Sequence, residues 1–161
     1  MTRIIDHTER KANAVKACVS LLNARLAEAI DLSLMAKQAH WNLKGSNFFS
    51  LHGMFDNIRE QMDDQVDALA ERAVQLGGEA LGTSQAVSAG TSLTAYPTTI
   101  STGREHLAAF GERLGAASDK ARASIAEVDE SGDAGTADIL TAYSLMLEKS
   151  LWFVNSHTGD H

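Results

Sequence analysis

The chain has little cysteine, little proline, no long apolar run and few basic residues, and these shortages exclude several classes of protein. Cys18 is the only cysteine, so an internal disulfide cannot form, and the thiolate set typical of structural zinc sites is missing. Cys18 lies in an apolar series, which predicts a buried and unreactive thiol. No run of about 18 apolar residues occurs, and the N-terminus has no signal-peptide core. We therefore expect a cytoplasmic protein without a membrane segment.

Basic residues are outnumbered by acidic ones, 14 against 21, which gives a formal net charge of −7. Phosphate binding depends on clustered Lys and Arg. The composition therefore disfavours attachment to nucleic acid through the body of the protein, and it suits a protein that attracts cations.

The scarcity of proline, with Pro97 as the only one, accompanies abundant Ala and Leu and no strand-like alternation. At 161 residues, 44% of them hydrophobic, the chain is predicted to form one domain over 1–161, with short flexible tails at about 1–8 and 156–161.

Apolar periodicity predicts four long helices. The first is expected over about 6–44, the third over about 103–128 and the fourth over about 136–156. The second is expected to begin at a cap formed by Ser46 or Asn47 and to end before Gly77. The second of them carries the apolar series Leu51, Phe55, Ile58, Met62, Val66, Leu69 and Val74.

A stretch rich in Gly, Ser and Thr, residues 79–102, separates the second and third long helices and is expected to hold one short helix near 84–88. In an antiparallel bundle a connection of this length links two parallel neighbours, which is the topology of ferritin-like proteins. We therefore predict an all-α, ferritin-like four-helix bundle with a long crossover.

Five residues with metal-ligand side chains recur at separations of 12, 4, 11 and 4: His40, His52, Asp56, Asp67 and Glu71. The last four form two pairs one helical turn apart and fall within an arc of roughly 100° on one helix. The rise from Asp56 to Asp67 is about 16 Å, against metal bonds of about 2 Å. One copy of the helix therefore cannot close the site.

Two antiparallel copies of the helix, related by a two-fold axis near its middle, would place the His52/Asp56 end of one beside the Asp67/Glu71 end of the other. His40 would join from the side of His52. Imidazole and carboxylate ligands without thiolate suit iron, manganese or zinc. The hypothesis is a metal site shared between subunits.

One alternative is a set of ordinary polar residues on a solvated helix face, and the apolar residues around the five ligands, Trp41, Phe48, Phe49, Phe55 and Ile58, argue against it. Another is a di-iron centre inside the bundle. Such centres use Glu-x-x-His pairs, and this sequence contains none.

Three segments, AKQAHWNLKGSNFFSLHGMFD, DALAERAVQLGGEALGT and TADILTAYS, resemble the Dps proteins, the DNA-binding proteins from starved cells. The likeness runs from about residue 10 to residue 155. It implies a hollow homododecamer with tetrahedral symmetry. Such a cage oxidises ferrous iron, preferentially with hydrogen peroxide, and stores the ferric mineral, which protects DNA from oxidative damage in starvation or stress.

The resemblance also implies roles for the five ligands. Asp67 and Glu71 of one subunit would bind iron with His40 of its partner, and His52 and Asp56 of the partner would complete a second, weaker position. All five are then the catalytic residues of a ferroxidase with two iron positions per intersubunit site, which zinc or another divalent ion can fill instead.

Trp41, beside His40, resembles a family tryptophan near the iron centre that takes up stray oxidising equivalents. A packed interface aromatic is the alternative.

Acidic residues crowd the turn between the last two helices: Glu127, Asp129, Glu130, Asp133 and Asp138. In the family, acidic residues near this turn line three-fold pores, and three copies would focus cations. Asp129, Asp133 and Asp138 are our pore candidates. Alternatively, these residues form a charged surface turn that stabilises the start of the following helix.

Family members that bind DNA directly often carry a Lys-rich N-terminal tail. Here the first 17 residues offer only Arg3, Arg10, Lys11 and Lys16 as DNA contacts, against two acidic residues. We therefore predict weak or absent DNA binding at neutral pH.

Three functions remain open: a ferroxidase and iron-storage cage, a nucleoid-binding protein that condenses DNA with a secondary metal site, and a structural dodecamer stapled by a divalent ion. The tail charge favours the first over the second. His7 and His106 are expected to be solvated surface residues.

Overall fold

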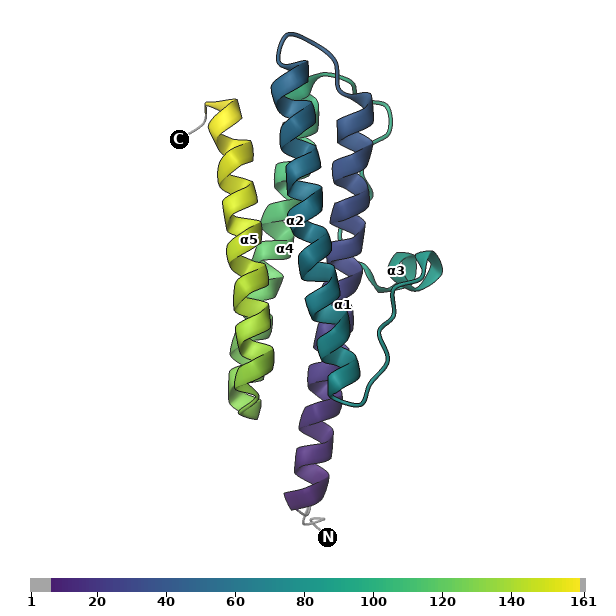
Figure 1. Ribbon diagram of the computed structural model, residues 1–161, viewed down its shortest axis with the longest axis vertical. Coiled ribbons are helices and arrows are strands. Elements are labelled where there is room, and N and C mark those ends of the chain that lie inside the picture. Colours follow the sequence, from purple (N-terminus) through teal and green to yellow (C-terminus); the bar gives the residue numbers. More distant parts are fainter. Residues whose placement is uncertain (1–6, 160–161) are drawn as a thin grey trace.

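The computed structural model describes the backbone of residues 7–159 and the side chains of residues 11–159. It contains five helices, α1 His7–Asn42, α2 Phe48–Gln75, α3 Ser84–Gly90, α4 Gly103–Ser131 and α5 Ala134–Thr158. The long helices α1, α2, α4 and α5 form a bundle, and the short α3 lies outside it on the connection from α2 to α4 (Figure 1). The predicted all-α fold with one long crossover is confirmed.

The helix boundaries follow local signals in the sequence. Gly77 and Gly132, with φ of 83° and 78°, adopt the left-handed conformation just after α2 and α4. Thr102 and Glu105 form a capping box at the start of α4. Asn47 precedes α2, although its side chain makes no capping hydrogen bond. Helix α1 begins at His7 and α5 continues to Thr158, and the single domain with flexible tails stays a prediction.

The core runs the length of the bundle between the four long helices. Phe55 of α2 and Phe110 of α4 meet edge to face at its centre, with ring centroids 5.4 Å apart. Cys18 is buried as predicted, and its thiol lies 3.4 Å from the Ser131 hydroxyl. Val74, in contrast, is 56% exposed, so the burial expected from its place in the apolar series is wrong. In the last turn of α2 the buried residue is Ala73.

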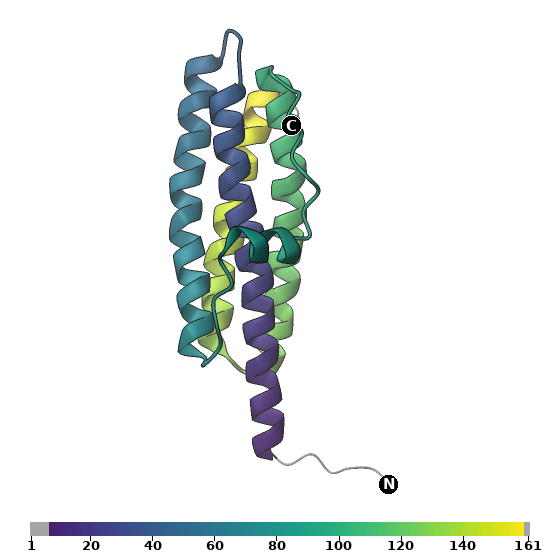
Figure 2. The ribbon, with the colours of Figure 1, turned by 90° about the vertical axis from the view of Figure 1, so that its right-hand side faces the viewer.

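After α3 the crossover runs alongside α4 (Figure 2), and a few polar contacts join the two. Arg113 donates hydrogen bonds to the carbonyl oxygens of Thr94 and Ala95 at 2.9 and 2.6 Å, and its guanidinium lies 5.5 Å from the ring centroid of Tyr96. The prediction that His106 is a solvated residue is wrong, because the crossover covers it and leaves it 1% exposed.

The middle of the bundle holds a buried carboxylate that is neutralised by the protein itself. Glu28 is fully buried and pairs with Arg25 at 2.8 Å, while Arg25 also donates to the Ser124 hydroxyl at 2.7 Å. A buried carboxylate requires such a partner, because burial of an unpaired charge is costly.

No helix in the described part of the chain is long and apolar enough to cross a membrane.

A candidate metal centre divided along helix α2

His40, in the last turn of α1, and His52, near the start of α2, stack against each other. Their ring centroids are 3.5 Å apart and the planes are inclined by 22°. Nδ1 of His40 lies 2.8 Å from the carbonyl oxygen of His52, and Nδ1 of His52 lies 2.9 Å from that of His40. Because a carbonyl oxygen only accepts, each Nδ1 is the donor. In the neutral form of each ring Nε2 then keeps a lone pair for a metal.

Asp56 lies one turn beyond His52, and its Oδ1 is 4.0 Å from Nδ1 of His40. The same carboxylate oxygen is paired with the ammonium group of Lys37 from α1. The hydrogen bond from Lys37, together with its positive charge, outweighs the effect of burial and lowers the pKa of Asp56. The carboxylate is therefore held in its anionic, ligand-competent form.

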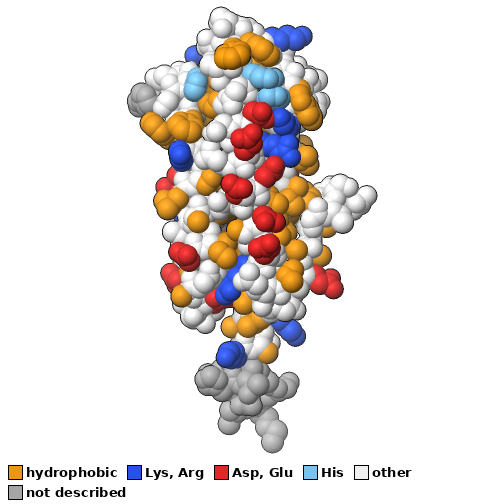
Figure 3. All heavy atoms as spheres, viewed as in Figure 1, with side chains coloured by type: hydrophobic (Ala, Val, Ile, Leu, Met, Phe, Trp, Pro, Cys, Tyr) orange, Lys and Arg blue, Asp and Glu red, His pale blue; other side chains and the backbone are white. Residues whose placement is uncertain are grey.

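Asp67 and Glu71 are exposed further along α2. Acidic side chains gather along the surface over this helix, with histidines near one end (Figure 3). The helical rise from Asp56 to Asp67 is about 16 Å. Among the described side chains of one copy, no group of three His, Cys, Asp or Glu is placed to hold a metal ion. His40, His52 and Asp56 are neighbours in the structure, whereas Asp67 and Glu71 lie further along α2.

Large apolar side chains are exposed around the two histidines. Phe49 is 88% exposed and Trp41 68%, and the ring of Phe48 lies 5.0 Å from that of His52. Exposed aromatic residues grouped in this way are typical of a protein–protein contact. An incomplete ligand set beside such a surface fits a site that a second copy completes.

The chain was compared with known proteins. A family model described as a ferritin-like domain matches residues 19–160. A "DNA protection during starvation protein" from Agrobacterium fabrum is 51% identical over 149 residues, which cover 92% of each chain. The chain belongs to the Dps family of ferritin-like proteins.

Solved structures of Dps proteins have the same fold. The tetragonal form of Mycobacterium smegmatis Dps is 32% identical with a TM-score of 0.87, over 90% of this chain and 88% of that one. DpsA14 from Streptomyces coelicolor is 33% identical with a TM-score of 0.86, over 89% and 85%. The Dps assignment made from three sequence segments is therefore confirmed.

The acidic turn between α4 and α5 divides into two groups. Asp133 caps α5 by accepting from the Thr136 backbone and pairs with Arg72 at 2.7 Å. Burial opposes its ionisation, but hydrogen bonds from Thr136 and Arg72 outweigh burial and lower its pKa. Asp133 thus stabilises the start of a helix. The remaining acidic residues of this region are exposed; they are Glu127, Asp129, Glu130 and Asp138. The pore role of Asp129, Asp133 and Asp138 stays a prediction.

The predicted DNA contacts are only partly described. Arg3 and the side chain of Arg10 lie outside the described residues, and Lys11 and Lys16 are exposed on α1. His157 is exposed, with Nδ1 2.8 Å from the carbonyl oxygen of Phe153.

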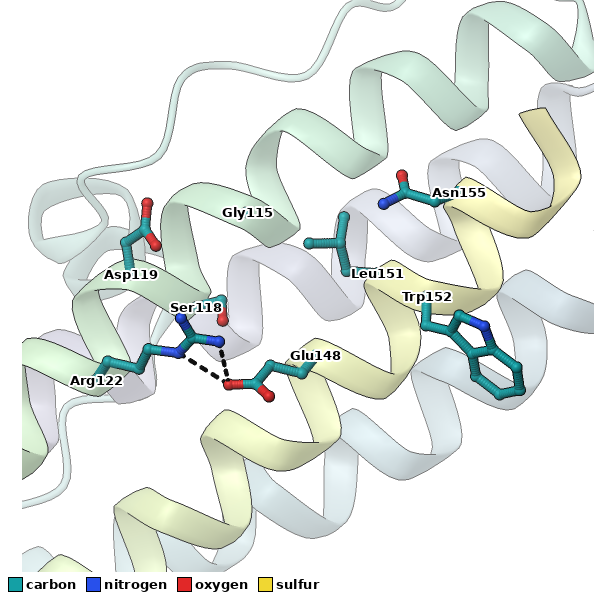
Figure 4. Close-up of a pocket in the computed structure, with 8 residues that line it drawn as sticks. All are labelled: Gly115, Ser118, Asp119, Arg122, Glu148, Leu151, Trp152 and Asn155. Carbon is teal, nitrogen blue, oxygen red and sulfur yellow. Dashed lines mark hydrogen bonds and ion pairs between the residues drawn. The ribbon is translucent and has the colours of Figure 1, made fainter. Parts of the chain in front are cut away.

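A separate surface hollow of about 520 Å³ lies between α4 and α5 (Figure 4). Arg122 donates to Glu148 there at 2.9 and 2.6 Å, and Trp152 at its edge is 60% exposed. Since Arg122 already neutralises Glu148, we assign the hollow no part in the candidate metal centre.

Sequence reasoning missed one residue at the centre, Lys37. Its signal was its spacing: Lys37 precedes His40 by three residues, which places the two side chains on one face of α1. What the spacing does not reveal is that its partner, Asp56, belongs to the next helix.

Proposed function

We propose that this Dps protein is a ferroxidase and iron-storage cage that acts in the cytoplasm. Its substrates are ferrous iron and hydrogen peroxide, and the ferric product is kept as a mineral inside a homododecamer. Two ferrous ions supply the two electrons that reduce one peroxide to water, so iron and peroxide are consumed together. Hydroxyl radicals then form less often, and DNA is protected chemically.

The observation that carries the proposal is the division of ligands along α2. His52 and Asp56 lie at one end of α2, with His40 of α1 beside them. Asp67 and Glu71 lie further along α2, at a distance that no single ion can bridge. A two-fold related copy, running antiparallel, brings the missing half to each end. The exposed apolar side chains around the histidines support this contact.

In the proposed site, Asp67 and Glu71 bind iron with His40 of the partner subunit, and His52 and Asp56 serve the second, weaker position. The carboxylates offset the charge that iron gains on oxidation. The neutral imidazoles bind through Nε2 without adding charge. Zinc or another divalent ion can occupy the same positions. Low pH weakens binding, because protonated imidazole cannot coordinate.

The test is the peroxide-driven oxidation of ferrous iron, followed by absorbance in anaerobic solution. We expect His40→Ala and Asp67→Asn to slow oxidation by about 10-fold or more. Asp64→Asn is the matched control, since Asp64 is an exposed carboxylate on the same helix outside the ligand set. Unchanged rates in both site variants would exclude the ferroxidase function. The remaining alternative would be a divalent ion that only links the subunits structurally.

A second candidate function is that of a nucleoid-binding protein that condenses DNA. The name of the relatives, DNA protection during starvation protein, is compatible with it. We expect DNA binding to be weak at neutral pH, because the basic residues near the N-terminus are few. A gel shift at about 0.1 M salt, where exposed charges are screened beyond about 10 Å, separates the two. Tight, salt-sensitive complexes would favour the second candidate.

A further inference from the structure

The two halves of the candidate centre differ in how their carboxylates are neutralised. Asp56 is paired with the ammonium group of Lys37. Among the side chains that the structure describes, no Lys or Arg nitrogen lies within 4.0 Å of the Asp67 or Glu71 carboxylates. A cation reaching the Asp67/Glu71 end meets free oxygen ligands. A cation reaching Asp56 meets a carboxylate that already has a positive partner.

The Lys37 side chain is well placed to compete with a metal. It is 21% exposed, whereas the Asp56 side chain is 41% exposed, so the ammonium approaches the carboxylate from the protein side. Asp56 Oδ1 faces both this ammonium and the His40 ring, whose Nδ1 is 4.0 Å away. A divalent ion bound by Asp56 would therefore sit close to a fixed positive charge, and the two cations repel each other.

We infer that Lys37 is a specificity-determining residue that sets the order in which the two metal positions fill. It supplies the counter-charge of Asp56 when the second position is empty, and it must leave the carboxylate before a metal can bind there. The Asp67/Glu71 position needs no such exchange and fills first. This inference rests on the proposed shared site, and it gives that site's weaker position a physical cause.

A purely structural role is the competing explanation. Lys37 joins α1 to α2, and the ion pair could serve only to hold these helices together. In that case its removal would lower stability and leave the affinity of both metal positions unchanged. Metal affinity, measured position by position, therefore distinguishes the two roles.

The experiment titrates the assembled, metal-free protein with Zn²⁺ by calorimetry and with Co²⁺ by visible absorption, so that no turnover occurs. For the wild-type protein we expect one strong and one weak step per shared site. In Lys37→Gln and Lys37→Met the weak step should strengthen by about tenfold or more, with the strong step unchanged. Lys37→Arg keeps the charge and should keep the weak step weak. Lys44→Gln, which removes an exposed charge just beyond α1, is the matched control.

Three results are decisive. A weak step that strengthens in both neutral variants, but in neither Lys37→Arg nor Lys44→Gln, supports the role of Lys37. A weak step that is the same in all variants, while Asp67→Asn still abolishes the strong step, overturns the role of Lys37 and leaves the shared site standing. If zinc binding depends on neither His40 nor Asp67, the proposed site itself fails, and the inference about Lys37 fails with it.

Discussion

The Tyr96 hydroxyl lies 2.9 Å from Nδ1 of His106, joining the crossover to a histidine that the folded chain buries almost completely. Burial, more than the opposing effect of Glu105, lowers the pKa of His106. The folded protein therefore binds a proton at this ring less readily than the unfolded chain does. The fastening of the crossover is thus sensitive to acid.

We predict that this histidine makes stability fall in mild acid. Its contribution is fully present above the unfolded pKa of about 6.5 and is lost as the pH falls below that value towards the lower folded pKa. The slope from this one group is at most about 1.4 kcal/mol per pH unit. Thermal unfolding of His106→Gln between pH 7.5 and pH 5 should show a smaller decline than wild type. His157→Gln, at an exposed histidine, is the control, and an equal decline in both variants would contradict the prediction.

Asp133 should also lose its contribution to stability as the pH falls, but in a more acidic range than His106. Its pKa is lowered, so its contribution is present above the unfolded pKa of about 3.9 and is lost as the pH falls through the folded value. Asp133→Ala removes both the α5 cap and the partner of Arg72 and should cost about 1–2 kcal/mol at neutral pH. Asp133→Asn keeps a capping side chain and should cost less. Urea unfolding of the two variants measures the difference, and equal losses would show that the cap contributes nothing.

The core is expected to depend on the pair of rings at its centre. Phe110 is fully buried against Phe55, and Phe110→Ala leaves a cavity that should lower the free energy of unfolding by about 3–5 kcal/mol. Phe110→Leu fills much of that space and should cost less. Thermal melts followed by circular dichroism measure both. A loss below about 1 kcal/mol for the alanine variant would mean that the bundle closes around the gap.

Phe49 should matter for association and not for folding. Its side chain is 88% exposed, so Phe49→Ser exposes no core and should leave the thermal midpoint of an isolated subunit unchanged. If the surface around the histidines contacts a second copy, the same substitution weakens that contact by about 1–3 kcal/mol. Light scattering coupled to size-exclusion chromatography reports the mass. Ser50→Ala, at the neighbouring exposed position, controls for local changes. An unchanged mass at low micromolar concentration would place the contact elsewhere.

Much of the fold was readable from local sequence signals. Gly77 and the Thr102 cap mark helix ends because each acts on its own backbone neighbourhood, and the length of the crossover indicates the bundle topology. The pairing of ligands along α2 was readable for the same reason, since helix geometry alone sets those separations. Helix ends and separations along one helix could therefore be predicted from the sequence.

Features that depend on contacts between distant segments were not readable. Burial of His106 requires the crossover to pass over α4, and nothing near residue 106 encodes that path. The pairing of Lys37 with Asp56 joins two helices, as does that of Arg72 with Asp133. Val74 belongs to the apolar series of α2, but Ala73 takes the inward position in the last turn and Val74 is exposed. Each case is decided by which element packs next to the residue.

The reciprocal bonds between His40 and His52 fix the orientation of both rings before any ion arrives. Each ring is held by the backbone of the other residue, so the turn from α1 to α2 and the two imidazoles form a single rigid unit. An incoming cation therefore costs little side-chain freedom at these positions. Most of the side-chain conformational entropy lost on ion binding should therefore come from the exposed Asp67 and Glu71, because their rotamers become fixed when the ion is bound.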